Sequence, residues 1–262
     1  AVPGKPSSIS GNSTPCEGST QTYSVTAVPG VIYAWHIPAG WTIVSGQGTN
    51  SLTVVIGNLS GIIRLVPSNS CGDGSYVELG VTVSPLPTSP GPITGNVVFC
   101  EGSKQTYSVT GISGVTYTWT FPSGWIIVDG QGTSVVTVYA GYESGSVVVV
   151  PSNGCGDGPA SKLEVTVNPK PSAYTGPDAT LCVGASIQIG GPAVPGNTYS
   201  WTSDPAGFTS TQSDPTVTPA ETTIYTLIEI NPATGCSDTN SVTVVANQVI
   251  NVTVNPASLT ET

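Results

Sequence analysis

The chain has very few charged residues and almost none of the side chains that usually carry catalysis. Its 262 residues include five Lys plus Arg against fifteen Asp plus Glu, a single histidine and no methionine. The net charge of −10 repels phosphate backbones and anionic lipid headgroups, so we expect no nucleic-acid partner. No run of 18 apolar residues is present, and we therefore expect no membrane insertion. The amino terminus has no signal-peptide character, which favours a mature or excised chain.

What the chain does contain is typical of an all-β protein. Hydrophobic residues make up 38%, and 32 Gly and 23 Pro interrupt the chain at short intervals. Val and Thr recur in alternating runs, as at 77–83, where apolar and mostly polar positions follow one another with the period of a strand. No comparable helical stripe appears.

Six cysteines divide the chain into three repeats. They form successive pairs separated by 55, 55 and 54 residues, and these are Cys16 and Cys71, Cys100 and Cys155, and Cys182 and Cys236. Four motifs also recur at a spacing of 84 residues. They are Cys-Glu-Gly-Ser at 16–19 and 100–103, Gln-Thr-Tyr-Ser-Val-Thr at 21–26 and 105–110, Gly-Gln-Gly-Thr at 46–49 and 130–133, and Cys-Gly-Asp-Gly at 71–74 and 155–158. The first two repeats are near duplicates.

The third repeat has diverged but keeps the same skeleton, because each repeat places a Tyr-x-Trp tryptophan nineteen residues after its first cysteine. These tryptophans are Trp35, Trp119 and Trp201. Proline-rich linkers separate the repeats and favour a stiff rod. The predicted domains are residues 1–86, 87–170 and 171–247, followed at 248–262 by a candidate start of a further repeat, or a strand for pairing between subunits.

Each repeat is predicted to fold as an immunoglobulin-like Greek-key β-sandwich of seven short strands. In the first repeat we expect strands near 20–27, 31–37, 41–46, 51–57, 61–68 and 76–84, with a short edge strand around 7–11. In the fifth of these six, Ile63 and Leu65 should face inward and Arg64 outward. In the second repeat Val147 and Val149 should face inward and Val148 outward.

Nearly identical cysteine spacing in three repeats predicts one disulfide within each domain, 16–71, 100–155 and 182–236, among fifteen possible connectivities. Because Cys16 comes just before one inner strand and Cys71 just after another, we expect antiparallel Greek-key topology to bring both to the same end of the sandwich. Three such bonds would place the protein in an oxidising compartment, outside the cytoplasm.

The Tyr-x-Trp segments at 33–41 and 117–125, with the Gly-Gln-Gly-Thr and Asn-x-Cys-Gly motifs, resemble the PKD-like domains of Bacteroidota surface proteins. The resemblance covers residues 5–170, and the third repeat is similar to a looser PKD-like or Ig-like member. It implies a spacer or adhesive module of exported proteins, often type IX secretion cargo, and no catalytic activity.

Few residues are candidates for a site. The single histidine, His36, is replaced by threonine in both other repeats, so we expect a surface residue and no enzyme. The cysteines lack the Cys-x-x-Cys spacing of zinc sites. Asp73 and Asp157 each offer calcium one carboxylate among glycines, which is typical of a tight turn, so we expect no cofactor and keep calcium as an alternative.

Five tryptophans remain. Trp35, Trp119 and Trp201 are predicted to pack in the core beside the disulfides. Trp41 and Trp125 follow Pro-x-Gly turns, so they either pack over the end of the sandwich or stack on sugar rings. Phe208 takes the matching position in the third repeat, which favours packing.

The sequence therefore predicts a non-enzymatic, extracellular or cell-surface stalk segment of an adhesin or multidomain protein. The alternatives are a carbohydrate- or protein-binding module of a secreted hydrolase, and a fibre subunit that assembles by strand addition through residues 249–254. The expected partners are neighbouring repeats or identical subunits, with surface glycans or proteins as further candidates.

Overall fold

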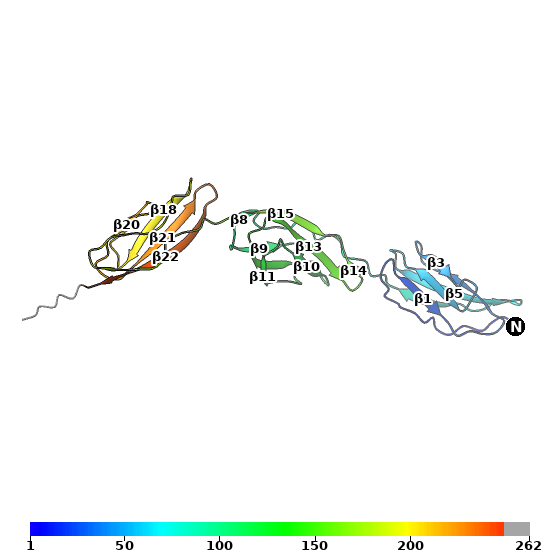
Figure 1. Ribbon diagram of the computed structural model, residues 1–262. Helices are drawn as coiled ribbons and strands as arrows, with labels where there is room; N and C mark the ends of the chain where they lie inside the picture. The colour runs from blue at the N-terminus through cyan, green and yellow to red at the C-terminus, as the bar shows by residue number, and fades with distance from the viewer. Residues whose placement is uncertain (249–262) are drawn as a thin grey trace, which may run out of the picture.

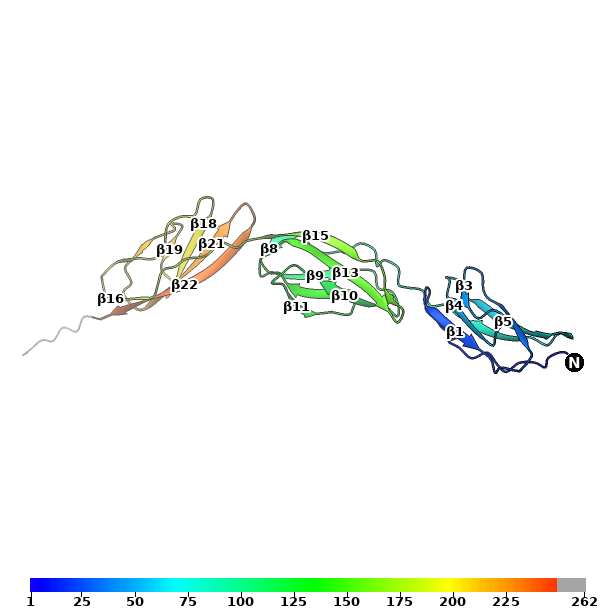
Figure 2. The same cartoon turned by 45° about the vertical axis from the view of Figure 1, so that its right-hand side comes forward.

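The computed structural model describes residues 1–248 as an all-β chain without helices. Within these residues no helix is long and apolar enough to cross a membrane. The strand predicted at 249–254 lies outside the described residues, as does all but the first residue of the segment 248–262. Figures 1 and 2 show the three repeats arranged end to end in an extended row, with the amino terminus at one end and β22 (Cys236–Asn247) at the other.

The first repeat is a sandwich of two antiparallel sheets. One sheet has the order β1-β4-β3, and the other places β5 between β2 and its partners β6 and β7. The strands are β1 (Thr20–Ser24), β2 (Ile32–His36), β3 (Thr42–Ser45), β4 (Ser51–Val55), β5 (Gly61–Asn69), β6 (Gly72–Asp73) and β7 (Val77–Val81). All six predicted main strands are present, and the predicted edge strand is reduced to a bridge between Ser10 and Ser24. The short strand β6 was not predicted.

The second repeat has the same two sheets, with the orders β11-β12-β9 and β10-β13-β15-β8, and β14 paired to β13. Its strands are β8 (Val98–Cys100), β9 (Lys104–Ser108), β10 (Thr116–Thr120), β11 (Ile126–Asp129), β12 (Val135–Tyr139), β13 (Gly145–Asn153), β14 (Gly156–Asp157) and β15 (Ser161–Asn168).

The third repeat has a larger sheet of order β16-β22-β21-β18-β19 and a small sheet of β17 and β20. Its strands are β16 (Ala179–Cys182), β17 (Ile187–Gln188), β18 (Thr198–Asp204), β19 (Thr209–Ser210), β20 (Thr216–Val217), β21 (Thr223–Asn231) and β22. The small second sheet reflects the divergence of this repeat from the first two.

Each repeat encloses its own hydrophobic cluster between its sheets. Ile63 and Leu65 of β5 are fully buried and Arg64 between them is exposed, as the alternation predicts. Val147 and Val149 of β13 are likewise fully buried, whereas Val148 between them is half-buried and not exposed as Arg64 is. The three clusters share no residue, so each repeat has a core of its own. The boundaries at 86, 170 and 247 remain predictions.

Candidate functional site: the joints between repeats

The cysteines join successive repeats, and the predicted pairing within each repeat is wrong. Cys16 of the first repeat is bonded to Cys155 of the second, with their Cα atoms 5.4 Å apart. Cys100 of the second is bonded to Cys236 of the third, with a Cα separation of 5.6 Å. The bonds 16–71, 100–155 and 182–236 do not form, and Cys71 and Cys182 are free and exposed.

The topology explains the correction, because the two cysteines of a repeat lie at opposite ends of its sandwich. Cys16 forms a parallel bridge with Ser84, beyond the end of β7. Cys71 lies in the turn after β5, and β5 runs antiparallel to β7 with Gly61 opposite Val81. The nine residues of β5 span about 26 Å, whereas a disulfide needs Cα atoms within about 7 Å.

We call the end at which the chain enters a repeat its proximal end and the end at which it leaves its distal end. Cys71, Cys155 and Cys236 are proximal, and Cys16, Cys100 and Cys182 are distal. Because the repeats follow one another end to end, each distal cysteine of one repeat meets the proximal cysteine of the next.

The proximal turn at the first joint is held by one asparagine. The Asn153 side chain accepts a hydrogen bond from the Cys155 backbone N–H at 2.8 Å and donates one to the Pro85 carbonyl of the linker at 2.9 Å. The same side chain therefore orients the cysteine and fastens the incoming chain. The Cys155 sulfur lies 3.4 Å from the Ser84 carbonyl oxygen, which places it directly against the segment that leaves the preceding repeat.

The distal cysteine is held by the segment through which the chain leaves its own repeat. The N–H that follows Cys16, from Glu17, donates to the Ser84 carbonyl at 3.1 Å. At the second joint Glu101, which follows Cys100, donates to Asn168 at 3.0 Å. Both distal cysteines are thus fixed by the segment that continues into the linker.

The linkers are packed against the repeats that follow them. The Ser161 hydroxyl donates to the Gly91 carbonyl at 2.6 Å, and a Cβ on Gly158 would collide with the Pro87 backbone. At the second joint the Asn240 side chain donates to the Ala173 carbonyl at 3.1 Å. Each joint therefore combines a docked linker with a covalent bridge.

Trp41 and Trp125 pack over the sandwich end. Trp41 is 7% exposed, and its indole N–H donates to the Leu59 carbonyl at 3.0 Å. Trp125 is half-buried, stacks on Phe121 at a centroid distance of 5.6 Å and donates to the Glu143 carbonyl at 3.1 Å. Trp41 has no exposed ring face for a sugar, and Trp125 exposes part of its ring only.

The Tyr-x-Trp tryptophans are buried as predicted, but no disulfide lies within their repeat cores. A glutamine from the Gly-Gln-Gly-Thr motif holds the backbone of the first of them instead. The Gln47 amide accepts from the Trp35 N–H at 3.1 Å and donates to the Trp35 carbonyl at 3.0 Å, and Gln131 does the same for Trp119. The motif therefore caps the free edge of β2 and of β10, a role that its sequence did not reveal.

The other candidates are separated from one another. His36 is exposed on β2 opposite Arg64, which forms an ion pair with Glu78 at 2.7 Å. Asp73 and Asp157 lie in the short strands β6 and β14, and the Asp157 carboxylate accepts from the Ser152 hydroxyl. Within residues 1–248 no three His, Cys, Asp or Glu side chains gather as metal ligands.

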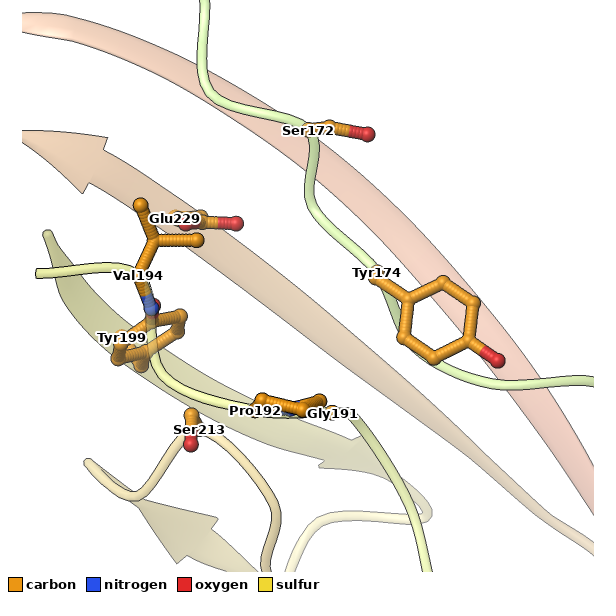
Figure 3. Close-up of a pocket in the computed structure, with 8 residues that line it drawn as sticks. All are labelled: Ser172, Tyr174, Gly191, Pro192, Val194, Tyr199, Ser213 and Glu229. Carbon is orange, nitrogen blue, oxygen red and sulfur yellow. The ribbon is translucent and has the colours of Figure 1, made fainter.

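A cavity of about 150 Å³ lies in the third repeat. Tyr174, Tyr199 and Glu229 are among the residues that line it (Figure 3). The Glu229 side chain is 2% exposed and accepts from the Asn197 amide at 2.7 Å. It is the one acidic group lining this cavity, and Asn197 already occupies one of its oxygens.

Comparisons with known proteins agree with the fold. The PKD-like domain family matches residues 2–81 and 86–165, which together exceed half of the chain. No curated protein matches.

Among solved structures, the chain is similar to Sidekick-1 immunoglobulin domains 1–5, with 11% identity, coverage of 93% of this chain and 60% of that chain, and a TM-score of 0.33. It is also similar to extracellular domains 3–5 of Drosophila OTK, with 12% identity, coverage of 94% and 100%, and a TM-score of 0.28. A third is the Escherichia coli adhesin FdeC, with 14% identity, coverage of 91% and 96%, and a TM-score of 0.28.

Proposed function

This chain belongs to the PKD-like domain family, and from that premise we propose that it is a non-enzymatic extracellular stalk whose successive repeats are covalently coupled. The observation that carries the proposal is the placement of both disulfides between repeats, Cys16–Cys155 and Cys100–Cys236. Each core is closed by its own strands, so the bonds act on the joints.

A second covalent connection changes how a joint moves. One peptide linker leaves two repeats free to rotate about every axis, whereas two separate attachments leave rotation only about the line that joins them. The linker contacts of Asn153 and Ser161 restrict that remaining motion. A row of such joints resists bending, which is what a stalk requires to hold a distal domain away from a surface.

The bonds also support an extracellular location, because disulfides persist outside the reducing cytoplasm. The Tyr-x-Trp and Gly-Gln-Gly-Thr motifs, which resemble those of Bacteroidota surface proteins, support a place in an exported adhesin or multidomain protein of that group, with type IX secretion as the route. An adhesive or glycan-binding role has less support, because Trp41 is buried and Trp125 is half-buried.

Single-molecule stretching between the two ends of the chain tests the proposal. With both bridges intact, the shortest covalent path runs from Ala1 to Cys16, crosses to Cys155, returns to Cys100, crosses to Cys236 and continues to Thr262. That path contains roughly 100 residues, so the unfolded chain extends to about 340 Å. The reduced chain extends to about 900 Å at roughly 3.4 Å per residue.

The oxidised protein is therefore expected to stop extending at little more than a third of the reduced length. The variant Cys71→Ser is the matched control, since it removes a free thiol and should keep the short limit. Equal lengths before and after reduction would rule out bridged joints and with them the covalently coupled stalk.

A further inference from the structure

Cys71 and Cys182 are free, but each lies at a position that is bonded in the other repeats. Cys71 is the proximal cysteine of the first repeat, and the proximal cysteines Cys155 and Cys236 are both in disulfides. Cys182 is the distal cysteine of the third repeat, and the distal cysteines Cys16 and Cys100 are both in disulfides. The two free thiols are therefore of opposite type, one at each end of the row of repeats.

The proximal turn around Cys71 has the geometry of a bonded joint. The Asn69 side chain accepts from the Cys71 N–H at 2.8 Å and donates to the Ala1 carbonyl at 2.9 Å. Asn153 makes the same two bonds at the same two lengths with Cys155 and Pro85. Ala1 thus takes the place that Pro85 has in the first joint.

The environment of the sulfur agrees with this correspondence. The Ala1 nitrogen lies 3.5 Å from the Cys71 sulfur, and in the first joint the Ser84 carbonyl oxygen lies 3.4 Å from the Cys155 sulfur. The backbone at Ala1 therefore passes Cys71 as the linker of a preceding repeat passes Cys155.

The distal end around Cys182 also reproduces the bonded geometry. Cys182 lies opposite Asn247 in a parallel pair, as Cys100 lies opposite Asn168. The next residue, Val183, donates its N–H to the Asn247 carbonyl at 3.0 Å, which equals the Glu101 bond to Asn168. Divergence of the third repeat has left this corner unchanged.

Exposure is the remaining difference. Cys71 and Cys182 are exposed, whereas Cys16, Cys100 and Cys155 are half-buried and Cys236 is buried. Their bonded counterparts are covered by the neighbouring repeat, so the two free thiols lie on repeat ends that are arranged as joints but carry no neighbouring repeat within residues 1–248.

We propose that Cys71 and Cys182 each form a further inter-repeat disulfide. Cys71 bonds to the distal cysteine of a preceding PKD-like repeat, and Cys182 bonds to the proximal cysteine of a following one. Repeats of this kind then form a continuous row in which every distal cysteine is bonded to the proximal cysteine of the next repeat. The neighbouring repeat belongs either to the same polypeptide or to a second copy of this chain.

The chemistry is an oxidation of two thiols. Each new bond forms as the two sulfurs together lose two protons and two electrons, and a disulfide-class oxidant takes up the electrons and is reduced to two thiols. The inference extends the proposed stalk and rests on the same bridged joint.

One arm of the test uses separate chains. Full-length Cys71→Ser and Cys182→Ser variants are mixed in equal amounts in a buffer of reduced and oxidised glutathione, and crosslinked peptides are identified by mass spectrometry. The proposal predicts that bonds from Cys182 of one chain to Cys71 of the other exceed the symmetric bonds, Cys71 to Cys71 and Cys182 to Cys182, at least tenfold. Random pairing would give a ratio near one.

The second arm places both ends in one polypeptide. Residues 1–247, which end with β22, are fused to a full chain, so that Asn247 leads into Ala1 as Ser84 leads into Pro85. The free thiols should fall from four to two on oxidation, with a bond from the first Cys182 to the second Cys71. A matched fusion with the first Cys182 changed to serine should retain all three of its thiols.

The arms separate the sources of the neighbour. Selective bonding in both arms means that copies of the chain join one another, and bonding in the fusion alone means that the neighbour is a repeat of the same polypeptide. Statistical pairing in the first arm together with four remaining thiols in the second would overturn the proposal. The same digest reports Cys16–Cys155 and Cys100–Cys236, so this failure is distinguishable from failure of the stalk itself.

Discussion

At the scale of single residues, buried tyrosines make the stability of the sandwich cores depend on pH. Tyr107 is fully buried and its hydroxyl donates to the Asn96 carbonyl at 3.1 Å. Burial raises the pKa of Tyr107 to about 12, because the phenolate would lose its solvation. Burial also raises the pKa of Tyr23 and of Tyr225, although the Thr223 hydrogen bond partly offsets the effect at Tyr225.

These shifts predict a loss of stability at alkaline pH. Because the pKa of Tyr107 is higher in the folded than in the unfolded state, its contribution to the free energy of unfolding is complete below about pH 10. The contribution disappears as the pH rises from about 10 to about 12. For Tyr107 we expect a loss on the order of 1 kcal/mol in the free energy of unfolding, measured by denaturant titration across that range.

Tyr107→Phe is the matched variant. It should cost about 1 kcal/mol at pH 8, where the hydrogen bond to Asn96 is lost, and should flatten the alkaline decline. Both proteins need the Cys71→Ser and Cys182→Ser changes, because free thiolates attack disulfides at high pH. An unchanged alkaline slope in Tyr107→Phe would assign the decline to other groups.

At the scale of strands, a side chain takes the place of a missing backbone partner. β2 and β10 are edge strands, and Gln47 and Gln131 bond both backbone groups of a tryptophan on them. In the third repeat no such glutamine is needed, because β19 pairs with β18 and places Ser210 opposite Trp201. One strand edge is thus covered by two different means in related repeats.

Replacing Gln131 with alanine should destabilise the second repeat by about 1–2 kcal/mol, because two hydrogen bonds to the Trp119 backbone are lost to water. Denaturant unfolding measures the change. Gln21→Ala is the control, since the Gln21 amide donates to one side-chain hydroxyl, that of Ser19. If the two variants unfolded alike, the edge-capping role of Gln131 would be wrong.

The alternation of side chains along each strand explains why the strands were predictable. Alternation along 61–68 reports which side chains face the core, and Ile63 and Leu65 are buried as that pattern requires. The two-residue strand β6 and the glutamine caps carry no alternation, so nothing local in the sequence indicates them. β6 forms because it pairs with the end of β5 in a tight hairpin, and the glutamine caps form because the fold brings Gln47 beside Trp35 on β2.

At the scale of the whole molecule, the two disulfides couple the stability of successive repeats and also restrict their relative orientation. The two disulfides span 139 and 136 residues, so each encloses parts of two repeats. In the chain-entropy description, closing a loop of that length stabilises the folded state by about 5 kcal/mol.

Cys155→Ser should therefore loosen the first joint without disturbing either neighbouring core. We expect a wider distribution of interrepeat distances and a smaller maximum dimension in small-angle X-ray scattering, together with earlier unfolding. Cys71→Ser serves as the control, because it removes a proximal cysteine that has no bond. Identical scattering from the two variants would show that linker packing alone holds the joint.

What the sequence determined by itself is local or periodic: the all-β class, the repeated units, the strand positions, the buried tryptophans and the need for disulfides. What only the tertiary structure decided is which cysteines meet. Pairing within repeats and pairing between successive repeats follow the same repeat period, so spacing cannot separate them. The choice depends on the parallel pairing of Cys16 with Ser84, which puts it a full strand length from Cys71 and against the next repeat. That distance is a property of the folded sandwich and of the order in which sandwiches follow one another.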